Sequence, residues 1–146
     1  MAKIRITKTF VFEMAHALLG YDGPCKHIHG HSYKLDVTIL GEPIEDKGSV
    51  KLGMVMDFGD LKQIVRKAIV EPFDHSLVLH RNAVIEHDAE MFGRVIYVDY
   101  QPTSENMIVD FAEKLNSLLP TEVKLHSLRL YETATSYAEW FVADNT

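Results

Sequence analysis

The feature that most constrains the fold is a two-residue alternation of apolar and polar side chains that occurs twice near the start of the chain. Because successive side chains of a strand point to opposite faces of a sheet, such alternation is typical of half-buried β-strands. We therefore expect two strands that pair as an antiparallel hairpin with one buried face. The apolar positions, interrupted only at Lys8, are Ile4, Ile6, Phe10, Phe12 and Met14, then Tyr33, Leu35, Val37 and Ile39.

Histidines extend the apolar face of both predicted strands. His16 continues the first row, and His29 and His31 extend the second row backwards. In an antiparallel hairpin the end of the first strand lies beside the start of the second, so the three imidazoles should converge. Any one of them alone would be an ordinary core or surface histidine. Three on one face favour a catalytic zinc site, which typically has three protein ligands and an open fourth position.

The cysteine content bears on the kind of metal site. A structural zinc site usually recruits several thiolates, whereas this chain has one cysteine, Cys25, and no CxxC pair. A single cysteine cannot form an intrachain disulfide, which agrees with a reducing compartment. We therefore expect a catalytic metal site in a cytoplasmic protein.

Length and composition set the outer limits. The 146 residues, with 47% hydrophobic and 25% charged side chains, predict a single soluble domain spanning residues 1–146. The sequence contains no apolar run of membrane-spanning length and no apolar signal core. The net charge of −6 argues against a nucleic-acid partner.

The rest of the chain predicts two helices and two more strands. A helix capped by Asp57 or Asp60 should run until Pro72, and a second should begin at residues 102–104 and stop before Pro120. Strands follow, one containing residues 128–130 and the other residues 137–142, while residues 41–53 and the stretch between Pro72 and Pro102 predict loops or irregular structure. The expected fold is α+β, a four-stranded antiparallel sheet with two helices on one face.

Three further positions carry possible chemistry. Glu132 falls on the inward face of its predicted strand, where a carboxylate needs a partner, although a strand-end glutamate can also reach solvent. Asp74 and His75 follow an apolar helix and form either a simple turn or a proton-transfer couple. Cys25 is either inert or a thiolate favoured by nearby positive charge. The remaining histidines have no comparable context and predict structural or surface roles: His27, His80, His87 and His126.

Six segments together carry a family resemblance. In chain order they read FEMAHAL, CKHIHGH, GMVMDFGDLK, FDHSLVL, PTSEN and YET. They resemble the 6-pyruvoyl-tetrahydropterin synthase and 6-carboxytetrahydropterin synthase family over nearly the whole chain. The resemblance implies a tunnelling fold (T-fold), in which trimers close their sheets into a barrel and pair face to face as homohexamers, with sites between subunits.

The resemblance also implies roles for individual residues. Zn²⁺ would be bound by His16, His29 and His31, and the substrate would be a pterin triphosphate. The catalytic residues would be Cys25, Asp74 and His75. Glu132 would anchor the pterin ring, in a pocket lined by Thr103, Ser104 and Glu105.

Two branches of the family give different products from 7,8-dihydroneopterin triphosphate. One releases acetaldehyde and triphosphate to give 6-carboxy-5,6,7,8-tetrahydropterin for queuosine and other 7-deazaguanines. The other eliminates triphosphate to give 6-pyruvoyl-tetrahydropterin. Three residues separate Cys25 from the His29-Gly30-His31 element, as in the carboxy-forming branch. The long stretch from Arg81 to Tyr100 departs from compact bacterial members of that branch.

Alternatives remain at this point. The chain could be a non-catalytic zinc- or pterin-binding assembly module, although such a module would be expected to lose the cysteine, the Asp-His pair or the glutamate. A pterin aldolase on a similar barrel would not need three metal-binding histidines. The sequence has no glycine-rich phosphate loop, and scattered lysines such as Lys26 and Lys51 do not identify a triphosphate site.

Overall fold

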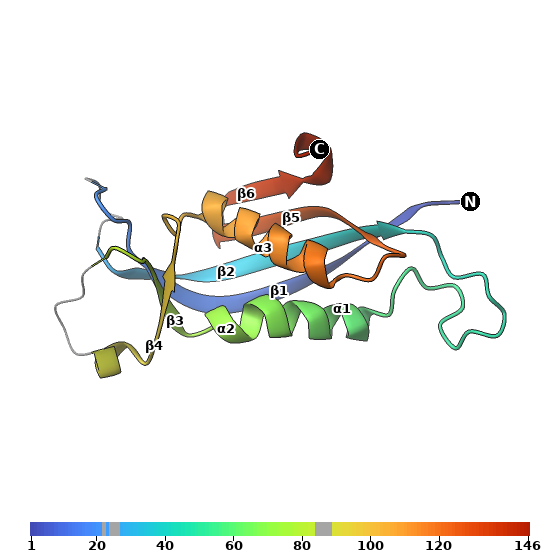
Figure 1. The fold of residues 1–146 in the computed structure, drawn as a ribbon, viewed down its shortest axis with the longest axis horizontal. Helices are drawn as coiled ribbons and strands as arrows, with labels where there is room; N and C mark the ends of the chain where they lie inside the picture. The colour runs from blue at the N-terminus through green and yellow to red at the C-terminus, as the bar shows by residue number, and fades with distance from the viewer. Residues whose placement is uncertain (22, 24–26, 84–88) are drawn as a thin grey trace.

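A long, curved sheet forms the body of the protein in the computed structural model, which describes all residues except 22, 24–26 and 84–88 (Figure 1). Within the described residues the sheet has six strands in the order β4-β3-β1-β2-β5-β6. Their bounds are β1 Ile4–His16, β2 His29–Gly41, β3 Ser76–His80, β4 Arg94–Val98, β5 Lys124–Thr133 and β6 Ser136–Phe141.

The predicted sheet of four antiparallel strands is wrong, because the described residues form a mixed sheet of six strands. The predicted strands β1, β2, β5 and β6 pair antiparallel, but β3 lies parallel to β1, and β4 lies parallel to β3. Four of the five β3 residues are buried, so this short strand shows no alternation and has only a brief apolar run as its signal. The segment predicted as irregular therefore extends the sheet beyond β1.

The first helix is built in three consecutive parts. They are α1 Phe58–Val65, a wider π-type segment Arg66–Val70, and α2 Glu71–Phe73. Asp57 caps the start by accepting from the Gly59 amide at 2.7 Å, as predicted. The helix ends one residue beyond Pro72 instead of before it. The π-type segment lies in the turn before Pro72. In a regular α-helix the ring of Pro72 would clash with a backbone carbonyl of that turn.

The second helix, α3, spans Ser104–Leu118, as predicted. Thr103 caps it by accepting from the Asn106 amide at 3.2 Å. Short 3₁₀ turns span Ala89–Phe92 and Val142–Asp144. None of the helices in the described part of the chain is long and apolar enough to cross a membrane.

Both helices cover the same face of the sheet and bury their apolar stripes against it (Figure 1). The Phe12 ring stacks on Tyr33, with centroids 5.4 Å apart, and meets the edge of Phe111 from α3 at 6.4 Å. The core continues along the helices through Leu61, Val65, Ile69, Phe73, Met107, Ile108, Ala112 and Leu115.

The opposite face of the sheet carries polar side chains. Thr9 donates to Asp36 at 2.7 Å, and Thr7 and Thr38 share a hydrogen bond of the same length.

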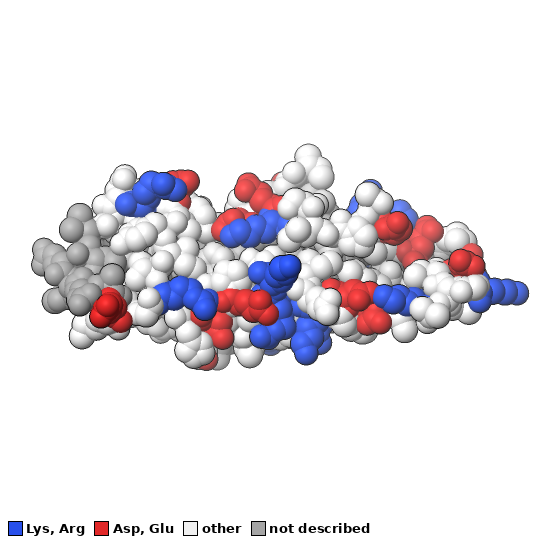
Figure 2. Space-filling model, turned by 60° about the horizontal axis from the view of Figure 1, so that its bottom comes forward, with Lys and Arg blue, Asp and Glu red and all other residues white. Residues whose placement is uncertain are grey.

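On the surface shown in Figure 2, acidic and basic side chains are interspersed and form no continuous basic stripe.

Candidate metal centre and active site

The β1–β2 register brings the three predicted histidines together. His16 lies opposite His29, and Met14 lies opposite His31. The ring centroids of His16 and His29 are 4.6 Å apart, and those of His29 and His31 are 4.8 Å apart. His16 is buried, whereas the other two histidines are half-buried. The alternation predicted this convergence at the end of the hairpin.

Backbone carbonyls fix the tautomers of two of these imidazoles. His16 Nδ1 lies 2.6 Å from the carbonyl oxygen of Pro102, and His29 Nδ1 lies 2.7 Å from that of His27. A carbonyl only accepts, so each Nδ1 carries the hydrogen and donates. In the neutral ring each Nε2 then has a free lone pair, which is the arrangement that metal-binding histidines use.

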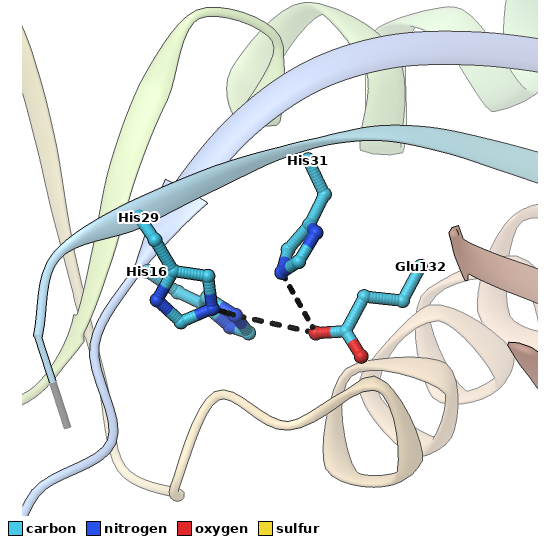
Figure 3. Close-up of side chains that lie close together, drawn as sticks. All are labelled: His16, His29, His31 and Glu132. Carbon is cyan, nitrogen blue, oxygen red and sulfur yellow. Dashed lines mark hydrogen bonds and ion pairs between the residues drawn. The ribbon is translucent and has the colours of Figure 1, made fainter. Parts of the chain in front are cut away.

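Glu132 joins the histidines at one point (Figure 3). Its Oε1 lies 3.3 Å from Nε2 of His16 and 3.3 Å from Nε2 of His31. The side chains of His16 and His29 approach to 3.1 Å between their Nε2 atoms. One ligand atom from each of the four residues lies within 4.8 Å of all the others.

The three short spacings, of 3.1, 3.3 and 3.3 Å, are close to those in a tetrahedral metal site. Ligands bound to zinc at 2.0–2.1 Å lie about 3.3–3.4 Å apart in a tetrahedron. In addition, the lone pairs of two neutral imidazoles and an ionised carboxylate would repel one another at such distances. An added proton or a cation between them removes the repulsion. Among the residues that the structure describes, this is the only group of three or more His, Cys, Asp or Glu side chains that could hold a metal ion.

The ionisation of the cluster also suits metal binding. Burial lowers the pKa of His31, while Glu132 acts in the opposite direction. The pKa of Glu132 is lowered chiefly by its contact with His16, and the nearby His31 and His29 act in the same direction. The Glu132 carboxylate therefore favours its negatively charged form, which is the form that binds a cation.

A β-bulge places the Glu132 carboxylate. The β5–β6 pairing shifts register between Tyr131 and Thr133, so Glu132 is the extra residue at this irregularity. Bulges re-aim side chains near the end of a ladder. The inward-facing position predicted for Glu132 is correct, and its partners are the histidines.

A pocket of about 420 Å³ adjoins Glu132. Ser104 and Glu105, from the first turn of α3, line it together with Tyr137 from β6. Ser104 is buried, and its Oγ has no hydrogen-bond partner among the described residues. Of the three residues predicted to line the pterin pocket, Thr103 is not in the lining, and its hydroxyl caps α3.

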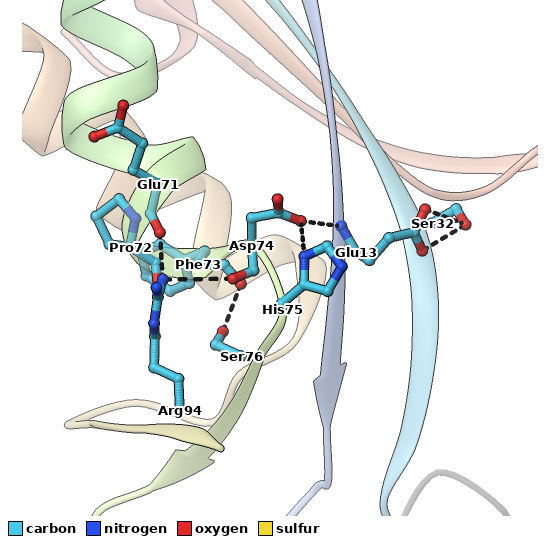
Figure 4. A network of polar contacts seen from close by, with 9 residues as sticks. All are labelled: Glu13, Ser32, Glu71, Pro72, Phe73, Asp74, His75, Ser76 and Arg94. Carbon is cyan, nitrogen blue, oxygen red and sulfur yellow. Dashed lines mark hydrogen bonds and ion pairs between the residues drawn. The ribbon is translucent and has the colours of Figure 1, made fainter. Parts of the chain in front are cut away.

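Asp74 and His75 form a contact pair directly after α2 (Figure 4). Asp74 Oδ1 lies 3.0 Å from His75 Nδ1 and also accepts from the backbone amide of Glu13 at 2.9 Å. The Glu13 hydrogen bond is the main reason that the pKa of Asp74 is lowered, and the contact with His75 adds to it. A charged Asp74 therefore orients the imidazole and leaves its Nε2 free.

The backbone of His75 is in the left-handed region, at φ 59°, which is uncommon for a residue other than glycine. Its amide donates to the carbonyl of Glu13 at 2.6 Å. Its side chain lines a pocket of about 410 Å³ together with Glu13, Ser32 and Phe92. Ser32 donates its hydroxyl to both oxygens of the Glu13 carboxylate, at 2.9 and 2.7 Å.

The Asp-His pair bonds to the backbone of Glu13, whose side chain points to the face of the β1–β2 hairpin opposite the histidine cluster. His16 and His31 alternate with Glu13 and Ser32 along the two strands and so point the other way. His75 is not part of the group of His16, His29, His31 and Glu132 in the same chain. Cys25, the third predicted catalytic residue, lies outside the described residues.

Sequence reasoning missed several contributors to these sites. The carbonyls of Pro102 and His27 hold the imidazoles through main-chain atoms, which leave no signal in residue type. Glu13 anchors the Asp-His pair through its backbone, and the alternation identified it only as an outward-facing polar residue.

A curled mixed sheet with helices on one face also occurs in solved proteins. A protein of Wolinella succinogenes, WS1659, shares the fold with a TM-score of 0.78 at 22% identity, over 97% of this chain and 99% of its own. The 6-pyruvoyl tetrahydropterin synthase of Caenorhabditis elegans gives 0.70 at 24% identity, over 97% and 96%. These likenesses define the fold class.

Sequence comparison identifies the family. A sequence model of the 6-pyruvoyl tetrahydropterin synthase family matches residues 5–142, and this chain belongs to that family. The 6-carboxy-5,6,7,8-tetrahydropterin synthase of Haemophilus influenzae is 36% identical over 141 residues, which cover 93% of this chain and 97% of that protein. The protein of the same name from Aquifex aeolicus is 32% identical, over 94% and 98%.

Proposed function

We propose that this protein is a zinc-dependent 6-carboxy-5,6,7,8-tetrahydropterin synthase in queuosine and 7-deazaguanine biosynthesis. It converts 7,8-dihydroneopterin triphosphate and water to 6-carboxy-5,6,7,8-tetrahydropterin, acetaldehyde and triphosphate. The observation that carries the proposal is the convergence of three imidazoles, whose candidate ligand atoms lie within 4.8 Å of one another. Relatives at 36% and 32% identity that bear this enzyme's name favour the carboxy-forming reaction.

The metal ligands in this proposal are His16, His29 and His31. Bound zinc supplies Lewis-acid polarisation of the substrate's side-chain hydroxyls, which lowers the cost of removing the neighbouring protons. The carbonyls of Pro102 and His27 keep the Nδ1 atoms of His16 and His29 protonated and direct their Nε2 atoms to the metal.

The organic substrate is held and deprotonated by side chains of the protein. The Glu132 carboxylate accepts paired N–H donors of the pterin ring, in the pocket lined by Ser104 and Glu105. Cys25, as a thiolate, removes a proton from the substrate's side chain. His75, oriented by Asp74, relays or returns that proton through Nε2.

The complete site is formed between subunits of a homohexamer, a dimer of trimers. Within one chain, the alternation along β1 directs His16 and Glu13 to opposite faces, and the Asp-His pair bonds to Glu13 and is not part of the histidine cluster. The imidazole of His75 therefore serves the metal centre of a neighbouring subunit.

Subunit mixing tests this arrangement. His29→Ala and His75→Ala hexamers should each retain only a small residual activity, but dissociating and reassembling them together should recover a larger part of the wild-type activity. Sites that combine an intact metal centre with an intact Asp-His pair form only across a mixed interface. Inactivity of verified mixed hexamers would contradict a shared site.

Product analysis tests the reaction itself. Zinc-loaded protein is incubated with 7,8-dihydroneopterin triphosphate, with Cys25→Ala as the matched control, and the products are identified by mass spectrometry. We expect 6-carboxytetrahydropterin and acetaldehyde from the wild type and neither from the variant. Predominant 6-pyruvoyl-tetrahydropterin would assign the chain to the other branch. No turnover would favour a non-catalytic binding module.

A further inference from the structure

Arg94, the first residue of β4, reaches the end of the helix that precedes the Asp-His pair (Figure 4). Its Nη1 donates to the backbone carbonyl of Glu71, to that of Pro72 at 3.0 Å and, over a longer distance of 3.4 Å, to that of Asp74. One guanidinium nitrogen thus contacts the chain both before the turn and within it.

These carbonyls need a donor because of where they lie. The last carbonyls of a helix have no partner in the helix, and the negative end of its dipole favours a cation. Arginine side chains near a helix C-terminus can supply both. The β3–β4 register places Arg94 directly opposite Ser76, one residue beyond the turn.

The turn held in this way is strained. Many helices end with a glycine in the left-handed conformation, but here His75 follows Asp74 and adopts φ 59° itself. A non-glycine residue keeps such a conformation only where its surroundings hold it, and these positions cluster at functional sites. Ser76 helps from the other side by donating its hydroxyl to the carbonyl of Phe73 at 2.5 Å.

We propose that Arg94 is a positioning residue for the Asp74–His75 pair, an inference that rests on the catalytic role proposed above for that pair. Arg94 fixes the carbonyls around the turn, so that His75 Nε2 stays directed toward the reacting proton. The guanidinium acts through His75 and needs no contact with the substrate. The parallel edge strand β4, which the sequence did not predict, supplies this group.

Steady-state kinetics of Arg94→Gln and Arg94→Lys test the proposal. Because a misplacement of about 1 Å can cost about 100-fold in rate, we expect Arg94→Gln to lower kcat by about 10- to 100-fold. KM and zinc content should change less than about twofold, since pterin and metal are bound elsewhere. Arg94→Lys, which keeps a cation with three donors, should recover part of kcat.

Arg81→Gln is the matched control. Arg81 also neighbours the β3–β4 edge, but its guanidinium pairs with Asp99 and both side chains are mostly exposed. The kcat of the Arg81→Gln variant should match that of the wild type. A melting temperature for each variant separates loss of fold from loss of positioning.

A double-mutant cycle asks whether Arg94 acts through His75. Arg94→Gln should cause no further loss of the residual kcat in a His75→Ala background. An equal loss in both backgrounds, with KM and zinc content unchanged, would overturn the positioning role.

Amide hydrogen exchange gives a readout that needs no turnover. The His75 amide, bonded to Glu13, should exchange faster in Arg94→Gln than in the wild type or Arg81→Gln, because the turn opens more often. Unchanged protection in folded Arg94→Gln would overturn the proposal. A wild type without turnover would refute the proposed function, while the exchange measurement would still decide whether Arg94 holds the turn.

Discussion

Replacing Glu132 with glutamine separates two roles that its position allows. Its Oε1 lies 3.3 Å from two of the three imidazoles, which is suitable for a fourth metal ligand. The same side chain is about 30% exposed and lines the pocket beside α3, which suits a pterin anchor. Glu132→Gln keeps the size and removes the charge.

The expected magnitude follows from the lost hydrogen bonds. A hydrogen bond to a charged group contributes about 1.5–3 kcal/mol, and about 1.4 kcal/mol corresponds to a tenfold change in rate or affinity. If Glu132 is a pterin anchor, its replacement should therefore lower kcat/KM by about 10- to 100-fold. Zinc affinity should change by less than about threefold, because three histidines still hold the metal.

The assay measures kcat/KM with 7,8-dihydroneopterin triphosphate and zinc affinity by competition with a chromophoric chelator. Glu105→Gln is the matched control, since Glu105 lines the same pocket from α3 but is not part of the histidine cluster. A collapse of zinc affinity in Glu132→Gln alone would refute the anchor role and make Glu132 a metal ligand.

Three further predictions concern metal, pH and packing. His16→Ala should weaken zinc binding, measured by chelator competition, by more than about 100-fold, because loss of an outer-shell partner alone costs about 10- to 100-fold. A loss of zinc affinity below about tenfold would exclude His16 as a ligand. Because the folded-state pKa of Asp74 is lowered from its ordinary 3.8, its stabilising contribution is present above that pH and is lost as the pH falls through the lower folded-state value. Below pH 3.8, wild-type stability in urea should therefore fall more steeply than that of Asp74→Asn, and parallel curves would contradict this. Phe12→Ala should cost about 3–5 kcal/mol of unfolding free energy. Val109→Ala, on the exposed side of α3, should stay within about 0.5 kcal/mol, and equal losses in denaturant melts would contradict the packing described.

The strongly patterned parts of the fold could be predicted from the sequence. Strands β1 and β2 are 13 residues long and half-buried, so their alternation indicated both the pairing and the face on which the histidines lie. The helix starts were equally readable, because Asp57 and Thr103 are capping residues followed by apolar stripes. The short strands β3 and β4 lacked such a period, since burial or brevity removes it.

The same distinction separates the site residues that the sequence predicts from those that it does not. Candidate side-chain ligands can be predicted where residue type and strand period coincide, as they do for His16, His29 and His31. Partners that act through the main chain cannot, because the carbonyl of Pro102 has the same chemistry as any other carbonyl. Adjacency in the sequence only suggests a contact between Asp74 and His75, since that contact depends on the left-handed turn at His75 and on the Glu13 backbone.

The two-residue period of a single hairpin also has a consequence for assembly. Moving one residue along β1, from Glu13 to Met14, changes the face of the sheet, so neighbouring residues of this strand belong to two different candidate sites. The face under the helices carries the histidine cluster, and Glu13, whose backbone holds the Asp-His pair, points to the other face. No rotamer change can move a side chain through a paired strand. If both groups act on one substrate, a second copy must supply one of them, so the catalytic need and the oligomeric state are a single prediction.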